Sequence, residues 1–318
     1  MEALMTTQDN TMTASQGGRI AEVIDMFAAQ ADCKESSRRT YRRNIKTFFA
    51  WVDETGRRVE ALTRADIIAF KQSLIPEYGA DKSTLTAAAY LTAVKLFYKW
   101  AEGVKLYPNI ANGVKLPKRY NRFEKEPLTA AQAKRLVSEV SAGESLRDEA
   151  IINIMLRCGL RCSEVVRANI EDLQQTAGRT ILNIKGKGRD SKDSFVIISD
   201  KCAASLRAYL ATRKDETPKA PLFVCNSNRN EGGRLTTRSV SRIAKEHLKA
   251  IGLDGRAYTA HSLRHTAGCL MLGNNVPFEM VQKTLRHANP ATTQAYVYHL
   301  DKQRRLEMAV ESKLDDII

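Results

Sequence analysis

The chain has 318 residues, of which 43% are apolar, and its 50 Lys and Arg exceed its 36 Asp and Glu, giving a net charge of +14. This length suggests about two domains, and the apolar content is enough for packed cores, which excludes a largely disordered or low-complexity chain. No run of about 18 apolar residues occurs, so we expect no membrane-spanning helix. The positive charge indicates a polyanionic partner such as nucleic acid, with a generic basic protein as the alternative.

The first segment, residues 1–18, is polar and is predicted to be a flexible tail without the apolar core of a secretion signal. Residues 19–106 have helical periodicity throughout and are predicted to form an all-helical domain. Within it we expect one helix from Ser36 onward, a second at about 66–74 and a third at about 83–100.

The helix that begins near Ser36 has two distinct faces. Apolar side chains recur at the spacing of one helical face, and basic side chains recur every three or four residues on another. The apolar face comprises Tyr41, Ile45, Phe48, Phe49 and Val52, and the basic stripe comprises Arg38, Arg39, Arg42, Arg43 and Lys46. We expect the apolar face to pack in the core and the basic stripe to face DNA, with a solvated face as the alternative.

The segment 107–127 combines proline, glycine and basic residues, and is predicted to be an extended basic linker. A second domain, residues 128–318, then opens with Thr129 as a helix N-cap. Its expected helices lie at about 130–141, 145–157, 200–213, 236–251, 260–273, 277–287 and 290–298, followed by an amphipathic segment at about 300–315.

A β-hairpin is expected inside the second domain. Two apolar runs, Thr180–Lys185 and Ser194–Ile198, flank a Gly-Lys-Gly-Arg-Asp turn. The predicted fold class is therefore mainly α with a small β-sheet: an all-helical N-terminal domain followed by an α+β domain.

Three short motifs of the second domain carry groups suited to phosphate chemistry. Arg161 lies in Gly-Leu-Arg-Cys-Ser-Glu, directly before a helix. His261 and Arg264, in His-Ser-Leu-Arg-His, lie three residues apart and so share one helical face. Tyr296 follows His287 by nine residues. Taken singly, each motif has an ordinary alternative: a salt-bridged arginine, a helix-surface pair, or a half-buried packing tyrosine.

Together these residues closely resemble the motif set of the tyrosine recombinases, the phage-integrase and Xer-type family. Lys187, in Gly186-Lys187-Gly188, matches the family's hairpin lysine, and the separation of 35 residues between His261 and Tyr296 fits as well. The resemblance extends to the core-binding helix over 37–51 and to the linker, and so covers all of the chain except the N-terminal tail.

The resemblance implies a site-specific DNA recombinase in which Tyr296 attacks a phosphodiester and forms a 3′-phosphotyrosine. A 5′-hydroxyl from another duplex then attacks the same phosphorus and exchanges the strands. Arg161 and Arg264 are expected to stabilise the negative charge that develops on the phosphoryl oxygens, because guanidinium groups offer forked donors and stay charged.

His261 and His287 are implied to donate hydrogen bonds and to move protons near working pH. Lys187, on a turn flanked by glycines, is implied to protonate the departing 5′-oxygen. No metal, nucleotide or other cofactor is expected, because the arginines already supply positive charge.

The family resemblance also implies partners. The two domains are expected to form a C-shaped clamp on double-stranded DNA that carries short inverted-repeat core sites. Four subunits are expected on two sites, with the terminal segment 300–315 docked on a neighbouring subunit; docking on its own subunit is the alternative.

The chain departs from the family pattern at a few positions. Cys158 and Cys162 flank the first arginine where other small residues are common, and Gly268 stands where Ala is usual. Arg286 precedes His287 where the family usually has Gly, which suggests an extra phosphate contact or an altered helix end.

Other polar residues near the motifs are assigned structural roles. Lys185 is expected to touch DNA backbone at most, His265 to pack inside the domain, Glu164 and Asp172 to orient arginines or cap helices, and Tyr298 to pack. No Cys-x-x-Cys pair indicates a zinc site, and the only Gly-Lys is followed by Gly188, so no P-loop is present. Six scattered cysteines favour a reducing compartment, and we expect a cytoplasmic protein.

Two rival functions remain at this point. One is a catalytically silent DNA-binding or architectural protein on the same fold, which the complete set of polar residues disfavours. The other is a type IB topoisomerase-like nicking-closing enzyme, which the two-domain length disfavours. Among recombinases, mobile-element integration and excision, chromosome-dimer resolution and cointegrate resolution stay open.

Overall fold

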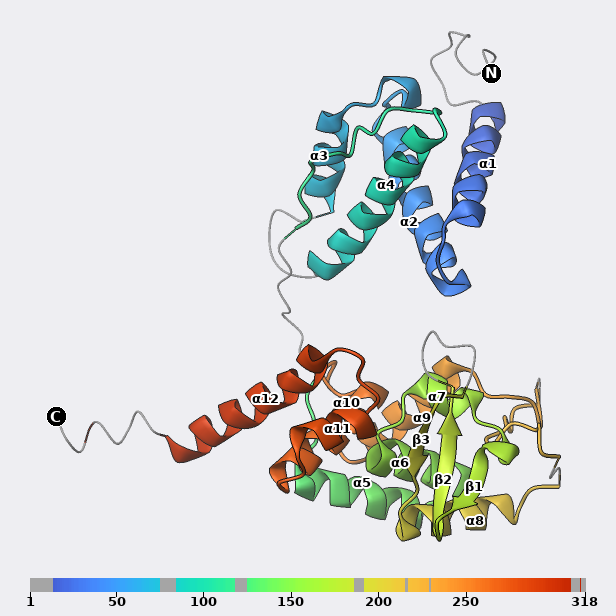
Figure 1. Cartoon of the computed structure of the whole chain (residues 1–318), viewed down its shortest axis with the longest axis vertical. Coiled ribbons are helices and arrows are strands. Elements are labelled where there is room, and N and C mark those ends of the chain that lie inside the picture. Colours follow the sequence, from blue (N-terminus) through green and yellow to red (C-terminus); the bar gives the residue numbers. More distant parts are fainter. Residues whose placement is uncertain are drawn as a thin grey trace. The chain divides into compact units, whose positions relative to one another are not determined.

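The computed structural model describes residues 14–74, 84–117, 125–185, 192–214, 217–228, 230–309 and 315. The chain divides into two compact units, Met1–Phe123 and Glu124–Ile318 (Figure 1). Each unit has its own apolar core. Within the described ranges, none of the helices combines the length and the apolar character needed to cross a membrane.

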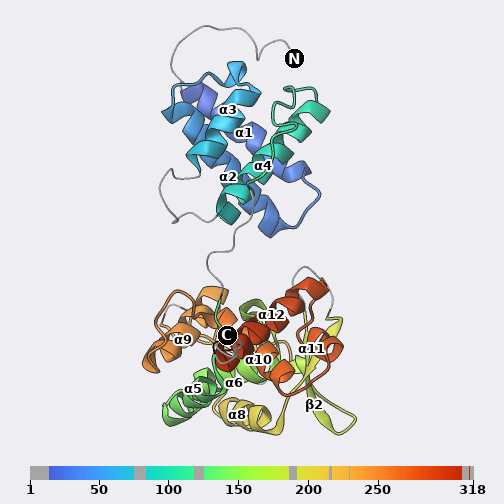
Figure 2. The same cartoon turned by 90° about the vertical axis from the view of Figure 1, so that its left-hand side faces the viewer.

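The first unit is helical throughout its described part. Its elements are α1 (Ala14–Gln30), α2 (Glu35–Glu54), the 3-10 helix η2 (Val59–Ala61), α3 (Arg64–Ser73) and α4 (Thr84–Gly103). The predicted apolar face of α2 is confirmed: Ile45, Phe48, Phe49 and Val52 are buried in a core rich in aromatic rings, and Tyr41 packs against its edge. Helices α1, α2 and α4 pack against one another (Figure 2). The helices therefore form because each buries one apolar stripe against the others.

The N-terminal helix α1 begins earlier than the sequence suggests. It starts at Ala14, inside the segment 1–18 that was expected to be a tail, and residues 1–13 lie outside the described residues. The apolar stripe begins only at Ile20, whereas the preceding turn contains polar residues and two glycines, so hydrophobic periodicity gave no signal for it.

The expected linker is packed at both of its ends. Ala111 and Val114 are buried in the first core, and the Tyr107 hydroxyl donates to backbone carbonyls of Glu60 and Leu62, at 3.0 Å each. Near the other end, Glu126 N donates to the Ala257 carbonyl at 3.3 Å, and the backbone N of Leu128, the first residue after the expected linker, donates to Thr266 Oγ1 at 2.8 Å. The prolines of this segment interrupt the helical pattern of the sequence, but residues between them are still buried. Residues 118–124 lie outside the described residues.

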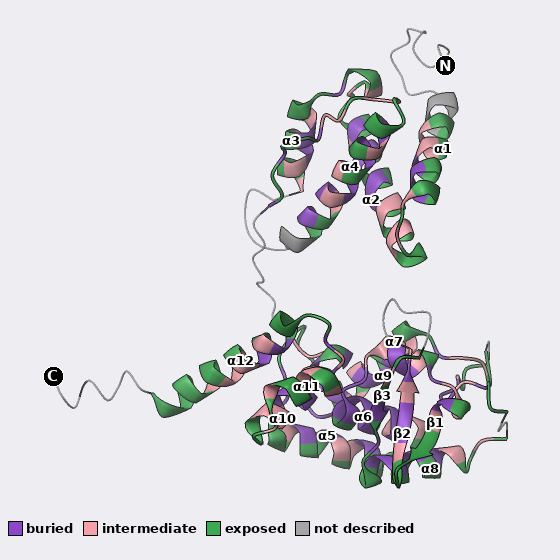
Figure 3. Cartoon of the chain, in the orientation of Figure 1, coloured by how far each residue is buried: buried purple, intermediate pink, exposed green. Residues whose placement is uncertain are grey.

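The second unit surrounds the buried helix α6. Its elements are α5 (Ala130–Ala142), α6 (Leu146–Cys158), α7 (Cys162–Arg167), η3 (Ile170–Asp172), β1 (Leu173–Thr176), β2 (Arg179–Ile184), β3 (Ser194–Ile197), α8 (Asp200–Leu210), α9 (Thr237–Ala250), α10 (Ala260–Gly273), α11 (Phe278–Thr284) and α12 (Pro290–Met308). Nearly every residue of α6 from Ala150 to Cys158 is buried (Figure 3), and α5, α8 and α10 pack around it.

The sheet is a three-stranded antiparallel meander in the order β1-β2-β3. The expected hairpin is confirmed as β2 and β3, paired from Ile181↔Ile197 to Ile184↔Ser194; its tip, residues 186–191, lies outside the described residues. β1 was not expected from the sequence, because this strand contains two glutamines, is largely exposed and shows no apolar alternation. A two-residue turn of Ala177 and Gly178, with φ of 49° and 73°, joins β1 to β2.

The last helix differs from the expected two pieces. α12 runs without interruption from Pro290 to Met308, because no proline or glycine breaks it near residue 299. Its second half extends from the body of the unit (Figure 1) and is largely exposed, with Leu306 72% and Met308 58% exposed. Residues 310–314 of the expected terminal segment lie outside the described residues.

Candidate active site

Arg161 is placed by a tight turn between α6 and α7. α6 ends at Gly159, whose φ of +61° is left-handed and which packs so closely on Leu285 that a Cβ would lie 2.4 Å from Leu285 Cδ2. Two residues later Arg161 is the N-cap of α7, and its backbone N–H donates to Glu164 Oε2 at 2.9 Å. The side chain of Arg161 stays 26% exposed, so part of its guanidinium remains available to a ligand.

α10 supplies the second arginine. Arg264 is fully buried, and its guanidinium donates to the carbonyl of Gly159 at 2.5 Å and to the carbonyl of Leu285. Burial, followed by the positive charge of Arg161, lowers the pKa of Arg264 to about 9. Arg264 Nε is buried without a hydrogen-bond partner among the described residues, which is a costly state that an added acceptor would relieve.

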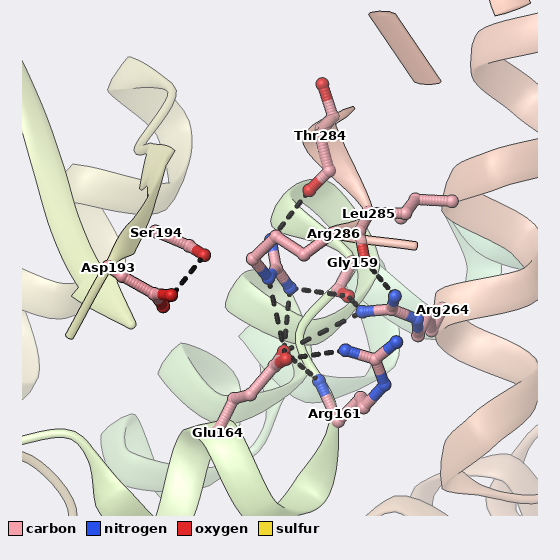
Figure 4. A network of polar contacts seen from close by, with 9 residues as sticks. All are labelled: Gly159, Arg161, Glu164, Asp193, Ser194, Arg264, Thr284, Leu285 and Arg286. Atoms are coloured by element: carbon pink, nitrogen blue, oxygen red, sulfur yellow. Dashed lines mark hydrogen bonds and ion pairs between the residues drawn. The ribbon is translucent and has the colours of Figure 1, made fainter. Parts of the chain in front are cut away.

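A buried carboxylate connects these arginines (Figure 4). Glu164 is fully buried; its Oε1 lies 2.7 Å from Arg161 Nη1, and its Oε2 lies 2.7 Å from Arg286 Nη2 and 3.7 Å from Arg264 Nη1. Burial alone would raise the pKa of Glu164, but the charge and hydrogen bonds of Arg286, with help from the other arginines, hold it below its usual value. Three guanidinium groups against one carboxylate leave the site positively charged.

Tyr296 lies in the second turn of α12, inside an apolar pocket. It is 2% exposed and packs with Cys269, Val281 and Leu285. The pocket has room because α10 carries Gly268 at this point: a Cβ there would lie 2.5 Å from Tyr296 Cε2. Burial raises the pKa of Tyr296, and the positive charge of Arg264 opposes this.

Three histidines lie around the tyrosine and its arginines. His287 is buried, its Nδ1 lies 2.8 Å from the Thr293 hydroxyl, and its ring centre is 5.8 Å from that of Tyr296. His265 packs edge-on between His261 and Tyr296, with ring centres 4.6 and 5.0 Å away.

The histidines share one electrostatic environment. Burial, followed by the charge of Arg264, lowers the pKa of His287 to about 3. The pKa of His265 is also about 3, because burial and the neighbouring His261 disfavour its charged form. Desolvation and then the charge of Arg264 also lower the pKa of His261, so all three rings are neutral near pH 7.

The structure brings together five of the six residues named from the motifs: Arg161, His261, Arg264, His287 and Tyr296. Lys187 lies outside the described residues. Sequence reasoning did not single out the Thr293 hydroxyl, the space at Gly268 or the Arg286–Glu164 ion pair. The replacements at 268 and 286 were the available signals, since each was a departure from the family pattern.

Arg286 does not have the free guanidinium that an extra phosphate contact requires. Its Nη1 donates to the Thr284 carbonyl at 2.6 Å and its Nη2 to the Gly159 carbonyl at 3.3 Å, besides the ion pair with Glu164. The second expectation, an altered helix end, fits better, because Arg286 has a left-handed φ of +55° just after α11.

The residues of the basic stripe on α2 do not all lie in the same surroundings. Arg39, Arg42, Arg43 and Lys46 line one shallow, open depression, whereas Arg38 Nε donates to the Ala31 carbonyl at 3.1 Å. Within the depression, two arginines pair with acidic neighbours, Arg39 with Glu35 at 3.1 Å and Arg42 with Asp25 at 2.6 Å. Exposed ion pairs of this kind are weak and exchange readily for a phosphate.

The chain matches known proteins over both of its units. Residues 126–304 match the model of the phage integrase family, and residues 21–107 match the phage integrase N-terminal SAM-like domain. Tyrosine recombinase XerC of Thermodesulfovibrio yellowstonii is 30% identical over 305 residues, covering 91% of this chain and 94% of that protein. Tyrosine recombinase XerC of Caldanaerobacter subterraneus subsp. tengcongensis is 36% identical over 179 residues, 56% of this chain and 48% of that protein.

Among solved structures, the post-cleavage complex of XerH site-specific recombinase with palindromic difH substrate has a TM-score of 0.68 at 19% identity, covering 93% of this chain and 84% of that one. This likeness shows a shared fold. The family matches and the relatives show more: the chain belongs to the phage integrase family. It is a tyrosine site-specific recombinase, an enzyme that cleaves and rejoins DNA.

Proposed function

We propose that Tyr296 is the nucleophile of this recombinase and that it forms a 3′-phosphotyrosine. The observation that carries the proposal is the placement of one tyrosine beside two arginines and neutral histidines in a positively charged site. The phenol oxygen attacks the phosphorus, the bond from phosphorus to the 5′-oxygen breaks, and the 5′-oxygen leaves as a hydroxyl. Attack by a 5′-hydroxyl on the phosphotyrosine reverses these steps and releases Tyr296.

The arginines and histidines have separate roles in this proposal. Arg161 and Arg264 donate to the nonbridging oxygens, where charge increases in the transition state. The unpartnered Arg264 Nε and the partly exposed Arg161 side chain support this role, because both offer donors to a phosphate. His261 and His287 are neutral in the free enzyme and are proposed to donate a hydrogen bond or to take the phenol proton. The negative charge of a bound phosphate favours their protonated forms, which burial and the arginines disfavour in the free enzyme.

Lys187 is proposed as the general acid that protonates the 5′-oxygen, on the strength of its match to the family's hairpin lysine. The strands β2 and β3 hold both ends of the hairpin that contains it. The reaction is proposed to require neither metal nor nucleotide, since strand exchange conserves the phosphodiester bond energy in the phosphotyrosine. Cleavage in excess EDTA tests this, and complete dependence of the chemical step on added magnesium would contradict it.

Double-stranded DNA with short inverted-repeat core sites is the proposed substrate. The basic residues of α2 support this, because they offer phosphate contacts outside the catalytic centre. Two structural relatives support it as well: the XerH complex with its palindromic difH substrate, and a lambda integrase dimer bound to a COC′ core site. A tetramer on two sites, joined through α12, is proposed from the exposed apolar residues on that helix.

The nucleophile can be identified by capturing the covalent adduct. Wild-type protein is incubated with a library of nicked duplexes of randomised sequence, and DNA that becomes attached to protein is recovered and sequenced. With the recovered duplex, Tyr296→Phe should bind DNA normally and form no adduct. Tyr298→Phe is the matched control: Tyr298 is 69% exposed and two residues away, and this variant should retain the adduct. Peptide mapping that places the DNA on Tyr298 would overturn the assignment.

A further inference from the structure

The feature that the proposed chemistry leaves unexplained is Arg286. It stands in the turn between α11 and α12 with a left-handed φ of +55°, a conformation that glycine adopts freely and other residues adopt at a cost. The residue after it is His287, so this backbone strain lies directly beside the proposed proton-transfer group. A strained arginine in such a place needs contacts that hold it there.

The side chain of Arg286 provides those contacts. It is only 8% exposed, and its Nη2 lies 2.7 Å from Glu164 Oε2, an ion pair across 122 residues of sequence (Figure 4). The same carboxylate oxygen lies 3.7 Å from Arg264 Nη1, and the other oxygen lies 2.7 Å from Arg161 Nη1. Glu164 therefore interacts with all three guanidinium groups at once.

A buried carboxylate and a DNA phosphate are competitors, because both are anions that bind guanidinium groups through the same donors. Without Arg286, the carboxylate of Glu164 would be neutralised by Arg161 and Arg264 alone. Arg161 Nη1 already contacts Glu164 at 2.7 Å, whereas Arg264 Nη1 lies 3.7 Å away, so Arg264 would be drawn closer to Glu164 and away from the position of the scissile phosphate. The fully buried Glu164 has no access to water that could weaken this attraction.

We propose that Arg286 is a positioning residue that neutralises Glu164 and thereby keeps the remaining donors of Arg161 and Arg264 available to the scissile phosphate. This inference rests on the proposed roles of those two arginines. Arg286 acts through Glu164 and not on the DNA, since its own donors are occupied by Glu164 and by the carbonyls of Gly159 and Thr284.

The test is a double-mutant cycle with single-turnover cleavage of the duplex recovered by adduct capture, at saturating enzyme. Arg286→Gly removes the side chain and relieves the backbone strain; it should slow cleavage roughly tenfold or more, as contacting charged residues commonly couple, with DNA affinity unchanged. Adding Glu164→Gln should restore much of the rate, because the neutral amide no longer attracts the two arginines. Arg286→Lys keeps a positive charge near Glu164 and should cleave faster than Arg286→Gly.

Two controls isolate the effect. Arg242→Ala removes one exposed positive charge from the same unit and should leave single-turnover cleavage unchanged. The double variant also tests direct contact: if Arg286 were itself a phosphate ligand, Glu164→Gln would not restore the rate that Arg286→Gly loses. Thermal unfolding identifies variants that remain folded, and Arg286→Lys provides the comparison if the glycine variant does not.

Several outcomes would overturn the inference: cleavage by Arg286→Gly at the wild-type rate, no gain from Glu164→Gln, or Arg286→Lys no faster than the glycine variant. If wild-type protein forms no adduct with any duplex, the proposed function fails; if it forms the adduct and the cycle shows no coupling, only the role of Arg286 fails.

Discussion

The buried state of Tyr296 depends on the absence of one methyl group at position 268. Replacing Gly268 by Ala places a Cβ 2.5 and 2.6 Å from two carbons of the Tyr296 ring and 3.0 Å from Leu285 Cδ1. Carbon atoms in contact lie about 3.5–4.0 Å apart, so the ring has to move by roughly 1 Å or leave the pocket. Gly268 thus sets how deeply Tyr296, the proposed nucleophile, is buried when no DNA is bound.

The size of the effect follows from two opposing terms. Overpacking a core position by one methyl group costs about 1–3 kcal/mol, all of it in the conformation with the ring buried. That cost shifts the ratio of buried to outward tyrosine by roughly fivefold to more than a hundredfold. Alanine also stabilises a helix by about 0.5–1 kcal/mol relative to glycine. Gly268→Ala should therefore expose Tyr296 with little change in melting temperature.

Chemical accessibility measures this shift. Nitration of Tyr296 by tetranitromethane, followed by peptide mass spectrometry, should be faster in Gly268→Ala than in wild type, with the exposed Tyr298 as the internal standard. Gly273→Ala is the matched control on the same helix, because a Cβ there meets nothing within 4 Å. A folded Gly268→Ala protein whose Tyr296 is as protected as wild type would refute the reasoning.

Three further expectations concern other parts of the molecule. Lys187→Ala should be impaired on ordinary DNA, by ~10²–10⁴-fold, and largely rescued when sulfur replaces the bridging 5′-oxygen, since a thiolate leaves without an acid; an equal defect on both substrates would exclude the general-acid role. Contacts with Asp148, the larger contribution, and with Glu139 raise the pKa of His247. Protonated His247 therefore stabilises the folded state fully below about pH 6.5, and this stabilisation is lost as the pH rises through the raised pKa. The melting temperature lost in His247→Gln should accordingly shrink between about pH 6 and pH 9, and a constant loss would contradict this. Arg42→Ala should reduce the slope of log affinity against log salt by ~0.9, for specific and nonspecific DNA alike; a loss confined to specific DNA would indicate base recognition.

Local signals were enough for much of the fold. The face of α2 formed by Ile45, Phe48, Phe49 and Val52 is buried as its periodicity indicates, and the two apolar runs around the Gly-rich turn pair as strands. The elements that were missed lack such signals. β1 is largely exposed, and Ala111 and Val114 are buried through contacts with distant helices despite the prolines on either side.

The candidate site shows the same division. Arg264 and Tyr296 were named from the resemblance of the combined motifs to a known family, because each motif alone has an ordinary structural alternative. Glu164 was expected to orient arginines or to cap a helix, and it contacts three arginines. Its pairing with Arg286 could not be predicted, because that residue is 122 positions away and meets it only through the packing of two turns. Tyr296 also gave no sequence signal of its burial, which depends on a glycine in another helix.

The short strap that precedes α5 limits how this protein can be divided into fragments. Lys125 Nζ donates to the Arg256 carbonyl at 3.1 Å, and Glu126 N donates to the Ala257 carbonyl at 3.3 Å. Leu128 N donates to the buried hydroxyl oxygen of Thr266. Thr266 lies two residues after Arg264 on the same helix. A fragment that begins at α5 would lack this segment and the contacts it makes with α10, the helix that carries Arg264. A fragment made for crystallisation or for domain exchange should therefore begin no later than Lys125.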